Sequence, residues 1–183
     1  TDDCPKPLLK VGEKPIIQTI IENFTEYGFH NFVISTHYKS EMIKDYLGHG
    51  NNLNCSIEYL QEESPLGTAG CLSLLSEKHL NKPLFMMNAD ILTKVNFTQL
   101  LDFHLKAKTS ITMCVRNYTH QIPYGVIRTN NHLIESIDEK PTKVSKVNAG
   151  IYLVNPNIIK NLTKGKNIDM PSLINNELDK NSS

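Results

Sequence analysis

Helix-like and strand-like patterns of apolar residues alternate through the first two thirds of the chain, and this alternation constrains the fold more than any other feature. Apolar residues at helical spacing mark helices, and short apolar or alternating runs such as 32–34 mark buried strands. In chain order the segments are 16–24 (helix, followed by Gly28), 32–34 (strand), 42–47 (helix, followed by Gly48), 55–59 (strand), 69–75 (helix), 84–87 (strand) and 97–105 (helix). This order predicts a parallel, Rossmann-like sheet with helices on both faces.

After Thr109 the connections shorten and strand-like segments predominate. They lie at 110–116, 124–129, 132–137 and 148–154, and a short helix at Pro156 and a last helix over 170–178 follow. We expect these strands to extend the parallel sheet into a mixed sheet. The chain shows no repeat, low-complexity segment or linker, so it predicts one three-layer α/β domain over residues 1–183.

Charge and apolar content exclude several classes of function. The 183 residues contain 19 Lys and Arg and 19 Asp and Glu, so there is no basic excess for general binding to nucleic acid or to a membrane surface. No apolar run reaches the ~18 residues of a membrane span. The four cysteines are scattered without metal-ligand spacing, which is typical of reduced thiols, and no signal peptide is visible. We therefore expect a cytoplasmic protein without nucleic-acid or membrane partners.

Ligands of open α/β sheets bind beyond the carboxyl ends of the strands, which selects the loops after Ser35, Tyr59 and Met87. Asp90 lies in the third of these loops, where a carboxylate can hold a divalent ion over bound phosphates. Near the N-terminus two prolines flank Lys6 in Pro5-Lys6-Pro7-Leu8-Leu9. They predict an extended segment that directs this lysine at a phosphate.

Further motifs contain residues that suit nucleotide or sugar binding. In the segment 61–70, a Pro-x-Gly turn and Thr68 at a helix start describe a backbone that a flat ligand can approach closely. The others are Tyr124-Gly125-Val126-Ile127, Glu139-Lys140-Pro141 and Asn148-Ala149-Gly150-Ile151-Tyr152. Each motif alone also has an ordinary structural explanation, such as a solvated loop, a helix cap or a turn glycine beside a surface ion pair.

Taken together, these motifs resemble those of the sugar-1-phosphate nucleotidylyltransferase family in both order and spacing. The resemblance runs from residue 4 to about residue 178, with Ala89 where the family usually has glycine. It implies the nucleotide-diphospho-sugar transferase fold. It also implies an enzyme that transfers a nucleoside monophosphate from a triphosphate to a sugar 1-phosphate and releases pyrophosphate.

The resemblance also assigns roles to the matching positions. Lys6 would meet the triphosphate, Lys140 the phosphate of the sugar and Asp90 a Mg²⁺ ion, and these three are the expected catalytic residues. The nucleoside would lie against Glu62, Pro65, Gly67 and Thr68. The sugar phosphate would lie against Tyr124, Gly125, Glu139, Lys140, Asn148 and Gly150. We expect these residues to surround one cleft.

The side chain at position 62 bears on the choice of nucleotide. Aligned on Pro65 and Gly67, Glu62 occupies the family's base-reading position. A carboxylate can accept from both N1–H and N2–H₂ of guanine, whereas a glutamine amide suits uracil or thymine better. The sequence therefore favours GTP and looks most like mannose-1-phosphate guanylyltransferases, although a one-residue slip would place Gln61 at this position.

Two elements of the family lie outside the matched region. The glycine-rich triphosphate loop precedes the position that Thr1 matches, and a second metal-binding aspartate follows the matched region. We therefore expect a catalytic domain that is incomplete at both ends and lacks its first, central strand. That strand's absence would leave a gap beside the strand at 83–88.

Other functions are compatible with parts of this pattern. A catalytically silent nucleotidylyltransferase-like regulatory domain would carry the same motifs, although such domains tend to lose the lysine and aspartate that are kept here. A uridylyl- or thymidylyltransferase of the same family would differ in the base. A nucleotide-sugar-dependent glycosyltransferase would carry Asp-x-Asp where Asn88-Ala89-Asp90 stands. The sequence does not identify the sugar, and a homo-oligomer is compatible with it.

Overall fold

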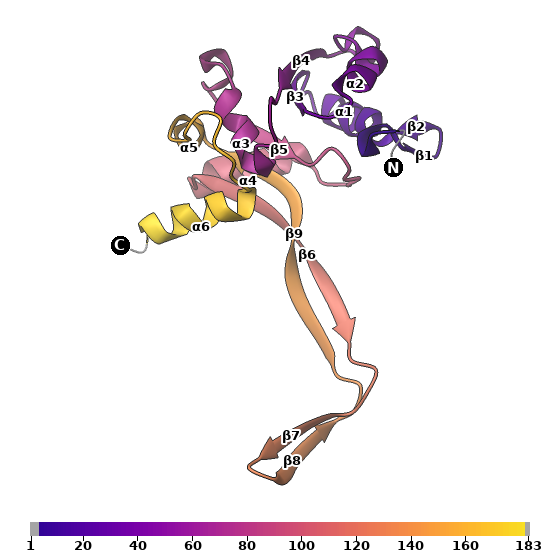
Figure 1. Ribbon diagram of the computed structural model, residues 1–183, viewed down its shortest axis with the longest axis vertical. Helices are drawn as coiled ribbons and strands as arrows, with labels where there is room; N and C mark the ends of the chain where they lie inside the picture. The colour runs from indigo at the N-terminus through magenta and orange to yellow at the C-terminus, as the bar shows by residue number, and fades with distance from the viewer. Residues whose placement is uncertain (1–3, 182–183) are drawn as a thin grey trace. The chain divides into compact units, whose positions relative to one another are not determined.

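A computed structural model describes residues 4–181, which divide into two compact units (Figure 1). The first unit comprises residues 1–112 and 152–183, and the second unit comprises residues 113–151. Thr1, the residue that matches the position after the family's triphosphate loop, lies outside the described residues.

The first unit contains most of the helices and strands that the sequence predicts. Its strands are β1 (Lys10–Val11), β2 (Lys14–Pro15), β3 (Asn31–Thr36), β4 (Ser56–Gln61) and β5 (Leu84–Met87). Its α-helices are α1 (Ile16–Glu26), α2 (Ser40–Leu47), α3 (Gly67–Gly70), α4 (Phe97–Ala107), α5 (Pro156–Lys160) and α6 (Met170–Asn181). Short 3-10 helices are η1 (Lys6–Leu8), η2 (Asn51–Leu53), η3 (Cys71–Leu74) and η4 (Glu77–His79). Of the helices in residues 4–181, none has both the length and the apolar character needed to cross a membrane.

The predicted parallel pairing is present in β3 and β4, which pair in the register Phe32↔Ile57. Parallel strands need a crossover connection, and α2 lies in the segment that joins them. Five of the apolar positions that predicted these elements become buried, whereas Met42 and Tyr46 of α2 stay exposed. The five buried residues form one core cluster, called here the N-terminal cluster: Ile17, Ile21, Ile43, Leu47 and Ile57.

Aromatic side chains connect α1 with α4 and with two strands. The ring of Phe24 on α1 stacks on that of Phe97, with centroids 3.8 Å apart. Phe24 also meets Phe85 of β5 and Phe32 of β3 edge-on, at 5.4 Å and 6.0 Å. Because one residue of α1 contacts both β3 and β5, this helix fixes the two strands relative to each other within the first unit.

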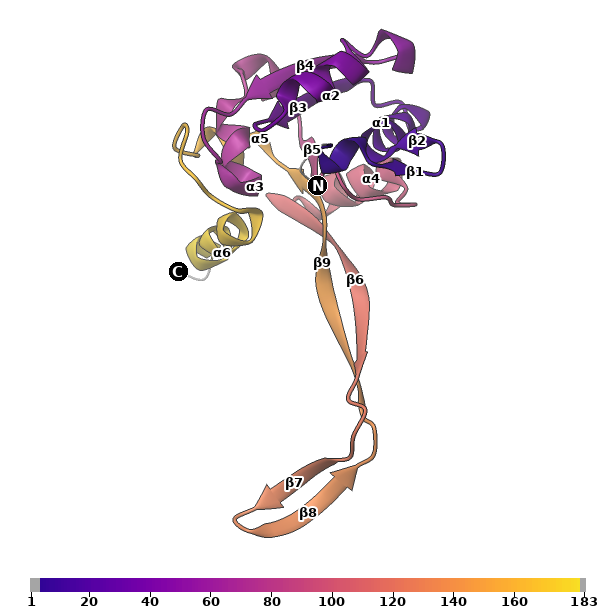
Figure 2. The same ribbon diagram turned by 45° about the vertical axis from the view of Figure 1, so that its right-hand side comes forward.

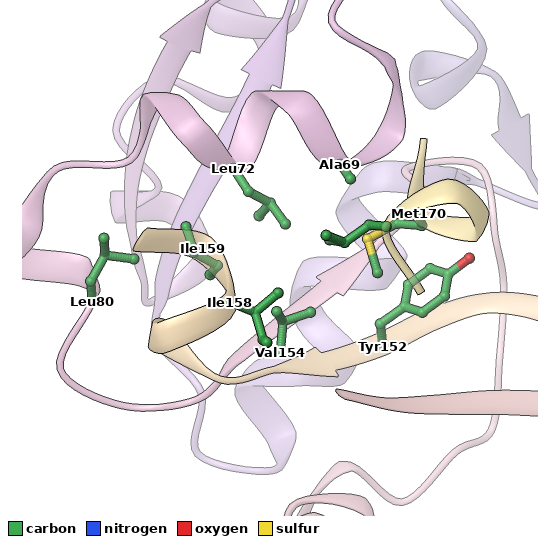
Figure 3. Packing of buried hydrophobic residues seen from close by; sticks show 9 residues of the cluster. Ala69, Leu72, Leu80, Tyr152, Val154, Ile158, Ile159 and Met170 are labelled. Carbon is green, nitrogen blue, oxygen red and sulfur yellow. The ribbon is translucent and has the colours of Figure 1, made fainter. Parts of the chain in front are cut away.

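A second core cluster joins α3 and η3 to the C-terminal part of the first unit. Figure 3 shows Ala69 and Leu72 directed toward Met170 and toward side chains of α5 and of β9 (Thr142–Val154). Ala69 and Met170 are fully buried. The C-terminal segment is thus part of the core of the first unit, and α3 is packed directly against it. The members of this cluster are Ala69, Leu72, Leu80, Tyr152, Val154, Ile158, Ile159, Met170 and Leu173.

The strand at 84–87, beside which we predicted a gap, lies at an edge of its sheet. The strand order of the three-stranded sheet is β5-β9-β6, with β6 at Ile111–Gln121 and β9 at Thr142–Val154. In residues 4–181, β5 therefore has a strand partner on one side, and β3 pairs with β4 alone. We expected buried strands at 32–34 and 84–87, but Phe32 to Ser35 and all of β5 are only half-buried.

The helix predicted over 69–75 is not a regular helix. It consists of four α-helical residues, Gly67–Gly70, followed by the 3-10 helix η3. Glycines at both ends of α3 weaken the helix. The N–H groups of Ala69 and Gly70 donate to Ile168 O, at 2.9 Å and 3.0 Å, so a neighbouring segment satisfies them.

Our expectation that all four later strands extend the parallel sheet was wrong for two of them, because the strands at 126–130 and 133–138 form an antiparallel sheet of their own. β7 (Val126–Asn130) and β8 (Leu133–Asp138) form a hairpin in which Ile127 pairs with Ile137 (Figure 2). The register shifts between Arg128 and Thr129, which marks a bulge. β6 and β9 lie side by side and extend well beyond the predicted 110–116 and 148–154.

Candidate functional site

Lys6 lies in the 3-10 helix η1, so our prediction of an extended segment was wrong. Leu8 N donates to Pro5 O at 2.9 Å and Leu9 N donates to Lys6 O at 3.0 Å, which closes the turn. Proline fixes φ near −65°, a value that a 3-10 helix shares with an extended segment. The Lys6 side chain is exposed, so its ammonium is accessible to an anionic ligand.

Lys6 and Asp90 are positioned by neighbours that pack on the same core. Leu8, two residues after Lys6, and Ala89, just before Asp90, both pack against the N-terminal cluster. Asp90 itself is exposed in a turn that begins two residues after β5 ends. Within residues 4–181 no three His, Cys, Asp or Glu side chains converge as a metal cluster. Asp90 thus offers a single accessible carboxylate at the carboxyl end of a strand.

Glu62 occupies the carboxyl edge of the parallel pair, where β4 ends. Its Oε1 accepts a hydrogen bond from Ser35 Oγ at 2.6 Å, and its Oε2 accepts one from Leu66 N at 3.0 Å. The carboxylate thus connects the end of β3 with the residue before α3. Gln61, the alternative base reader, donates from Nε2 to His37 O at 3.4 Å and accepts from Thr36 Oγ1 at 3.5 Å.

The loop that contains Pro65, Gly67 and Thr68 is held by the segment 165–170. Asn167 Nδ2 donates to Pro65 O at 2.8 Å, and Thr68 N donates to Asp169 Oδ1 at 3.1 Å. Thr68 Oγ1 in turn accepts from Met170 N at 2.9 Å. The structure therefore brings the predicted nucleoside-binding residues together in one hydrogen-bonded loop, with Thr68 bonded to the start of α6.

Segment 165–170 also explains two glycines of the P-L-G-T-A-G string. A Cβ on Gly67 would lie 2.7 Å from Ile168 O, and Gly67 has a φ of +75°, which favours glycine. A Cβ on Gly70 would lie 2.6 Å from Lys166 O. The close backbone approach that we predicted for a ligand is made here by the protein's own chain. Sequence reasoning missed this segment, because Asp169 before the helix at 170–178 is an ordinary helix-start signal that does not point to Thr68.

The thiol of Cys71 lies in the same region as Glu62. Burial raises the pKa of this thiol, and the negative charge of Glu62 raises it further, while a hydrogen bond with Ser35 acts in the opposite direction. Cys55 and Cys114 also have pKa values raised by burial. A raised pKa lowers the share of the reactive thiolate form in these three cysteines at neutral pH.

The second unit brings Gly125, Glu139 and Lys140 together. A Cβ on Gly125 would lie 3.1 Å from Glu139 Oε2, so glycine leaves room for this carboxylate. Glu139 Oε1 lies 4.0 Å from Lys140 Nζ, and both side chains are largely exposed. Tyr124 is 74% exposed. An exposed pair at this separation contributes little to stability. Because both side chains are exposed, their charges are accessible to a ligand.

Lys140 and Asn148 each have a local backbone role as well. Lys140 has a φ of +47°, and its carbonyl accepts from Gln121 Nε2 at 3.2 Å. Asn148 Oδ1 accepts from the N–H of Gly150 at 2.8 Å, and Gly150 has a φ of +70°. The E-K-P motif thus shapes a bend before β9, and Asn148 bonds to the backbone within β9, in addition to offering polar side chains.

A pocket of about 270 Å³ lies between α1 and the chain after β5. It includes Thr19 and Asn23 of α1, together with Leu92 and Lys94. Asn23 Nδ2 donates to Thr93 O at 3.1 Å, which ties α1 to this loop. None of the predicted site residues lines this pocket.

Comparison with known proteins relates the chain to one family. Residues 1–179 match the sequence profile of the nucleotidyl transferase family. A mannose-1-phosphate guanyltransferase of Aspergillus fumigatus is 35% identical over 167 residues, which are 86% of this chain and 46% of that protein. A mannose-1-phosphate guanylyltransferase of Mycobacterium tuberculosis is 27% identical over 175 residues, which are 93% of this chain and 48% of that protein. The chain thus spans about half the length of these relatives.

Solved structures share the fold. HddC from Yersinia pseudotuberculosis, in a complex with GMP-PN, has a TM-score of 0.69 and 20% identity, and the match covers 91% of this chain and 74% of that one. A putative glucose-1-phosphate thymidylyltransferase from Bacillus anthracis, in complex with a sucrose, has a TM-score of 0.74 and 21% identity, over 98% and 76% of the two chains. These structures bear out the predicted α/β fold class.

Proposed function

The chain belongs to the nucleotidyl transferase family, and on that premise we propose that the full-length protein transfers GMP from GTP to mannose 1-phosphate. The products would be GDP-mannose and pyrophosphate. The observation that carries this proposal is the similarity to mannose-1-phosphate guanyltransferases of fungi, at 34–35% identity over about 85% of this chain. Lys6, Asp90 and Lys140 all lie on exposed positions, as residues that meet anionic substrates require.

The reaction is a displacement at phosphorus. A sugar phosphate has a second pKa of about 6 and is largely dianionic at pH 7, so one of its oxygens can attack without a general base. That oxygen forms a bond to the α-phosphorus of GTP, and the bond from the α-phosphorus to the bridging oxygen of pyrophosphate breaks. Both substrates are anions, so the protein must position them and neutralise their charge.

Within this proposal each charged residue has one task. Lys6 binds the triphosphate and Lys140 binds the phosphate of the sugar, each as a cation with three N–H donors. Glu139 and Asn148 accept from or donate to the sugar hydroxyls. The loop with Pro65, Gly67 and Thr68 lies against the nucleoside, as the resemblance implies.

Asp90 fits the role of a Mg²⁺ ligand. Mg²⁺ is held in such enzymes by one or two carboxylates together with phosphate oxygens and water, and Asp90 offers one exposed carboxylate after a strand. The ion would supply positive charge to the phosphates of GTP. We assign Asp90 alone to the ion among the described residues.

An oxygen-isotope experiment tests this reaction. The full-length protein is incubated with GTP and mannose 1-phosphate that carries ¹⁸O in its phosphate oxygens, and the products are analysed by mass spectrometry. The proposal predicts pyrophosphate without label and GDP-mannose that has kept all four labelled oxygens of the sugar phosphate. Hydrolysis of GTP to unlabelled GMP or GDP, with labelled mannose 1-phosphate left intact, would contradict the proposal.

A further inference from the structure

The backbone of a single residue, Ile168, holds the buried side of the loop 65–70. Ile168 N donates to Leu66 O at 2.9 Å, and Ile168 O accepts from Ala69 N at 2.9 Å and from Gly70 N at 3.0 Å. Leu66, Ala69 and Gly70 are all buried. Because these bonds join backbone atoms, they do not depend on the side chain at position 168.

The exposed side of the loop is held by the side chains of the two neighbours of Ile168. Asn167 Nδ2 donates to Pro65 O at 2.8 Å, and Asp169 Oδ1 accepts from Thr68 N at 3.1 Å. Pro65 and Thr68 are exposed, and both are among the residues that the sequence assigns to the nucleoside. Asn167 and Asp169 thus bond to the part of the loop that is accessible to a nucleotide.

Thr68 and Asp169 bond to each other's helix start. Asp169 Oδ1 accepts from the N–H of Thr68, the second residue of α3, and Thr68 Oγ1 accepts from the N–H of Met170, the first residue of α6. Each side chain therefore satisfies a backbone donor that its own helix leaves without a partner, as a capping residue does. Met170 is fully buried, so this reciprocal pair connects the exposed side of the loop with the core.

The two side-chain contacts lie on either side of Gly67. This residue has a φ of +75°, and glycine populates many backbone conformations at little cost. A turn that contains glycine keeps one shape only where contacts with other residues select that shape. The bonds to Pro65 and Thr68 supply this selection for the exposed backbone.

We infer that Asn167 and Asp169 are positioning residues, which hold the exposed side of the loop 65–70 in the shape that binds the nucleotide. The inference rests on the proposed function, because that function assigns this loop to the nucleoside. Without these bonds a smaller share of the molecules has the loop in the binding shape, and the apparent affinity for the nucleotide falls in proportion to that share.

Substitutions at the two positions separate the hydrogen bonds from the charge. Asp169→Ala removes the bond to Thr68, whereas Asp169→Asn keeps an oxygen that can accept from Thr68 N and removes only the negative charge. Asn167→Ala removes the bond to Pro65. Both positions are exposed, so neither substitution leaves a cavity in the core.

The main measurement is the Kd of GTP with Mg²⁺ for the full-length protein, by titration calorimetry. We expect each alanine variant to raise this Kd by about 3–10-fold, the value of one hydrogen bond, and the double variant to raise it further. Asp169→Asn should stay within about threefold of wild type. The matched controls are Asp45→Ala on α2 and Asn175→Ala on α6, both at exposed positions, and they should leave the Kd unchanged.

Two outcomes of this titration would overturn the inference. An Asp169→Asn variant that loses as much affinity as Asp169→Ala would show that the charge acts on the ligand and not the bond on the loop. A double variant that binds fewer equivalents of GTP with the wild-type Kd would show that the two residues only stabilise the fold.

Hydrogen exchange at the Thr68 amide tests the inference independently of the reaction. In Asn167→Ala this amide keeps its partner Asp169, so a change in its exchange reports a change in the shape of the loop. Positioning predicts that the Thr68 amide exchanges about threefold faster or more in Asn167→Ala and at the wild-type rate in Asn175→Ala. Equal exchange in all three proteins would contradict the inference. If wild type neither binds GTP nor releases pyrophosphate, the proposed function fails, and this amide still decides whether Asn167 holds the loop.

Discussion

The charged residues of the candidate site differ in their exposure and in the hydrogen bonds that they form within the protein. Asp90 and Lys6 are exposed, and Lys140 lies 4.0 Å from its neighbour Glu139 with 60% of its side chain exposed. Glu62, in contrast, has both carboxylate oxygens bonded within the first unit. At the scale of single residues we therefore expect Asp90, Lys6 and Lys140 to act on substrates directly, and the Glu62 carboxylate to connect the end of β3 with the loop before α3.

Asp90→Asn in the full-length protein should lower kcat by a factor of about 100 or more at ordinary Mg²⁺ concentrations, because the amide is a poor ligand for this ion. The midpoint of thermal unfolding should not change, since the Asp90 side chain is exposed. Asp102→Asn, at an exposed position on α4, is the matched control and should leave both values unchanged. Retained activity in Asp90→Asn would remove Asp90 from the metal site.

Lys140→Ala should raise the KM for the sugar 1-phosphate by about 10–100-fold, the range for loss of a hydrogen bond to a charged group. Binding of GTP alone, measured by calorimetry, should be unchanged. Lys143→Ala, three residues further along the chain and also exposed, provides the control. An equal loss for sugar phosphate and GTP would indicate that Lys140 supports the fold of its turn, where it has a φ of +47°.

At the scale of elements, the sequence predicted which segments form helices and strands better than it predicted which other segments they contact. The spacing of Ile17, Ile21 and Phe24 predicts α1 correctly, because the same apolar face that sets the spacing becomes buried. The contacts of the P-L-G-T-A-G string could not be predicted, since its partners lie about a hundred residues away and their contacts are largely through backbone atoms. Local patterns contain no information on such a contact.

The packing of α3 on segment 165–170 predicts a difference between two glycines with positive φ. Gly67→Ala combines left-handed strain with a clash against Ile168 O, and should lower the free energy of unfolding by roughly 2–4 kcal/mol. Gly28→Ala has the strain without a neighbour within 4 Å and should cost only about 1 kcal/mol. Urea denaturation of the two variants measures both values. An equal decrease in the free energy of unfolding for both variants would mean that segment 165–170 can move to make room for the added methyl group.

At the scale of the whole molecule, the described residues contain two units that carry different parts of the candidate chemistry. The first unit carries Lys6, Glu62 and Asp90, and the second carries Tyr124, Glu139 and Lys140. We propose that nucleotide binding belongs to the first unit and sugar-phosphate binding to the second. The chain spans about half the length of its guanyltransferase relatives. Activity must therefore be measured on the full-length protein.

The most direct test is the kcat/KM for pyrophosphate release by the full-length protein, measured with each pairing of GTP, UTP, dTTP and ATP with mannose 1-phosphate and glucose 1-phosphate in the presence of Mg²⁺. We expect the highest value for GTP with mannose 1-phosphate, and no pyrophosphate when the sugar phosphate is left out. If no pairing releases pyrophosphate above the rate without protein, the proposed function is wrong.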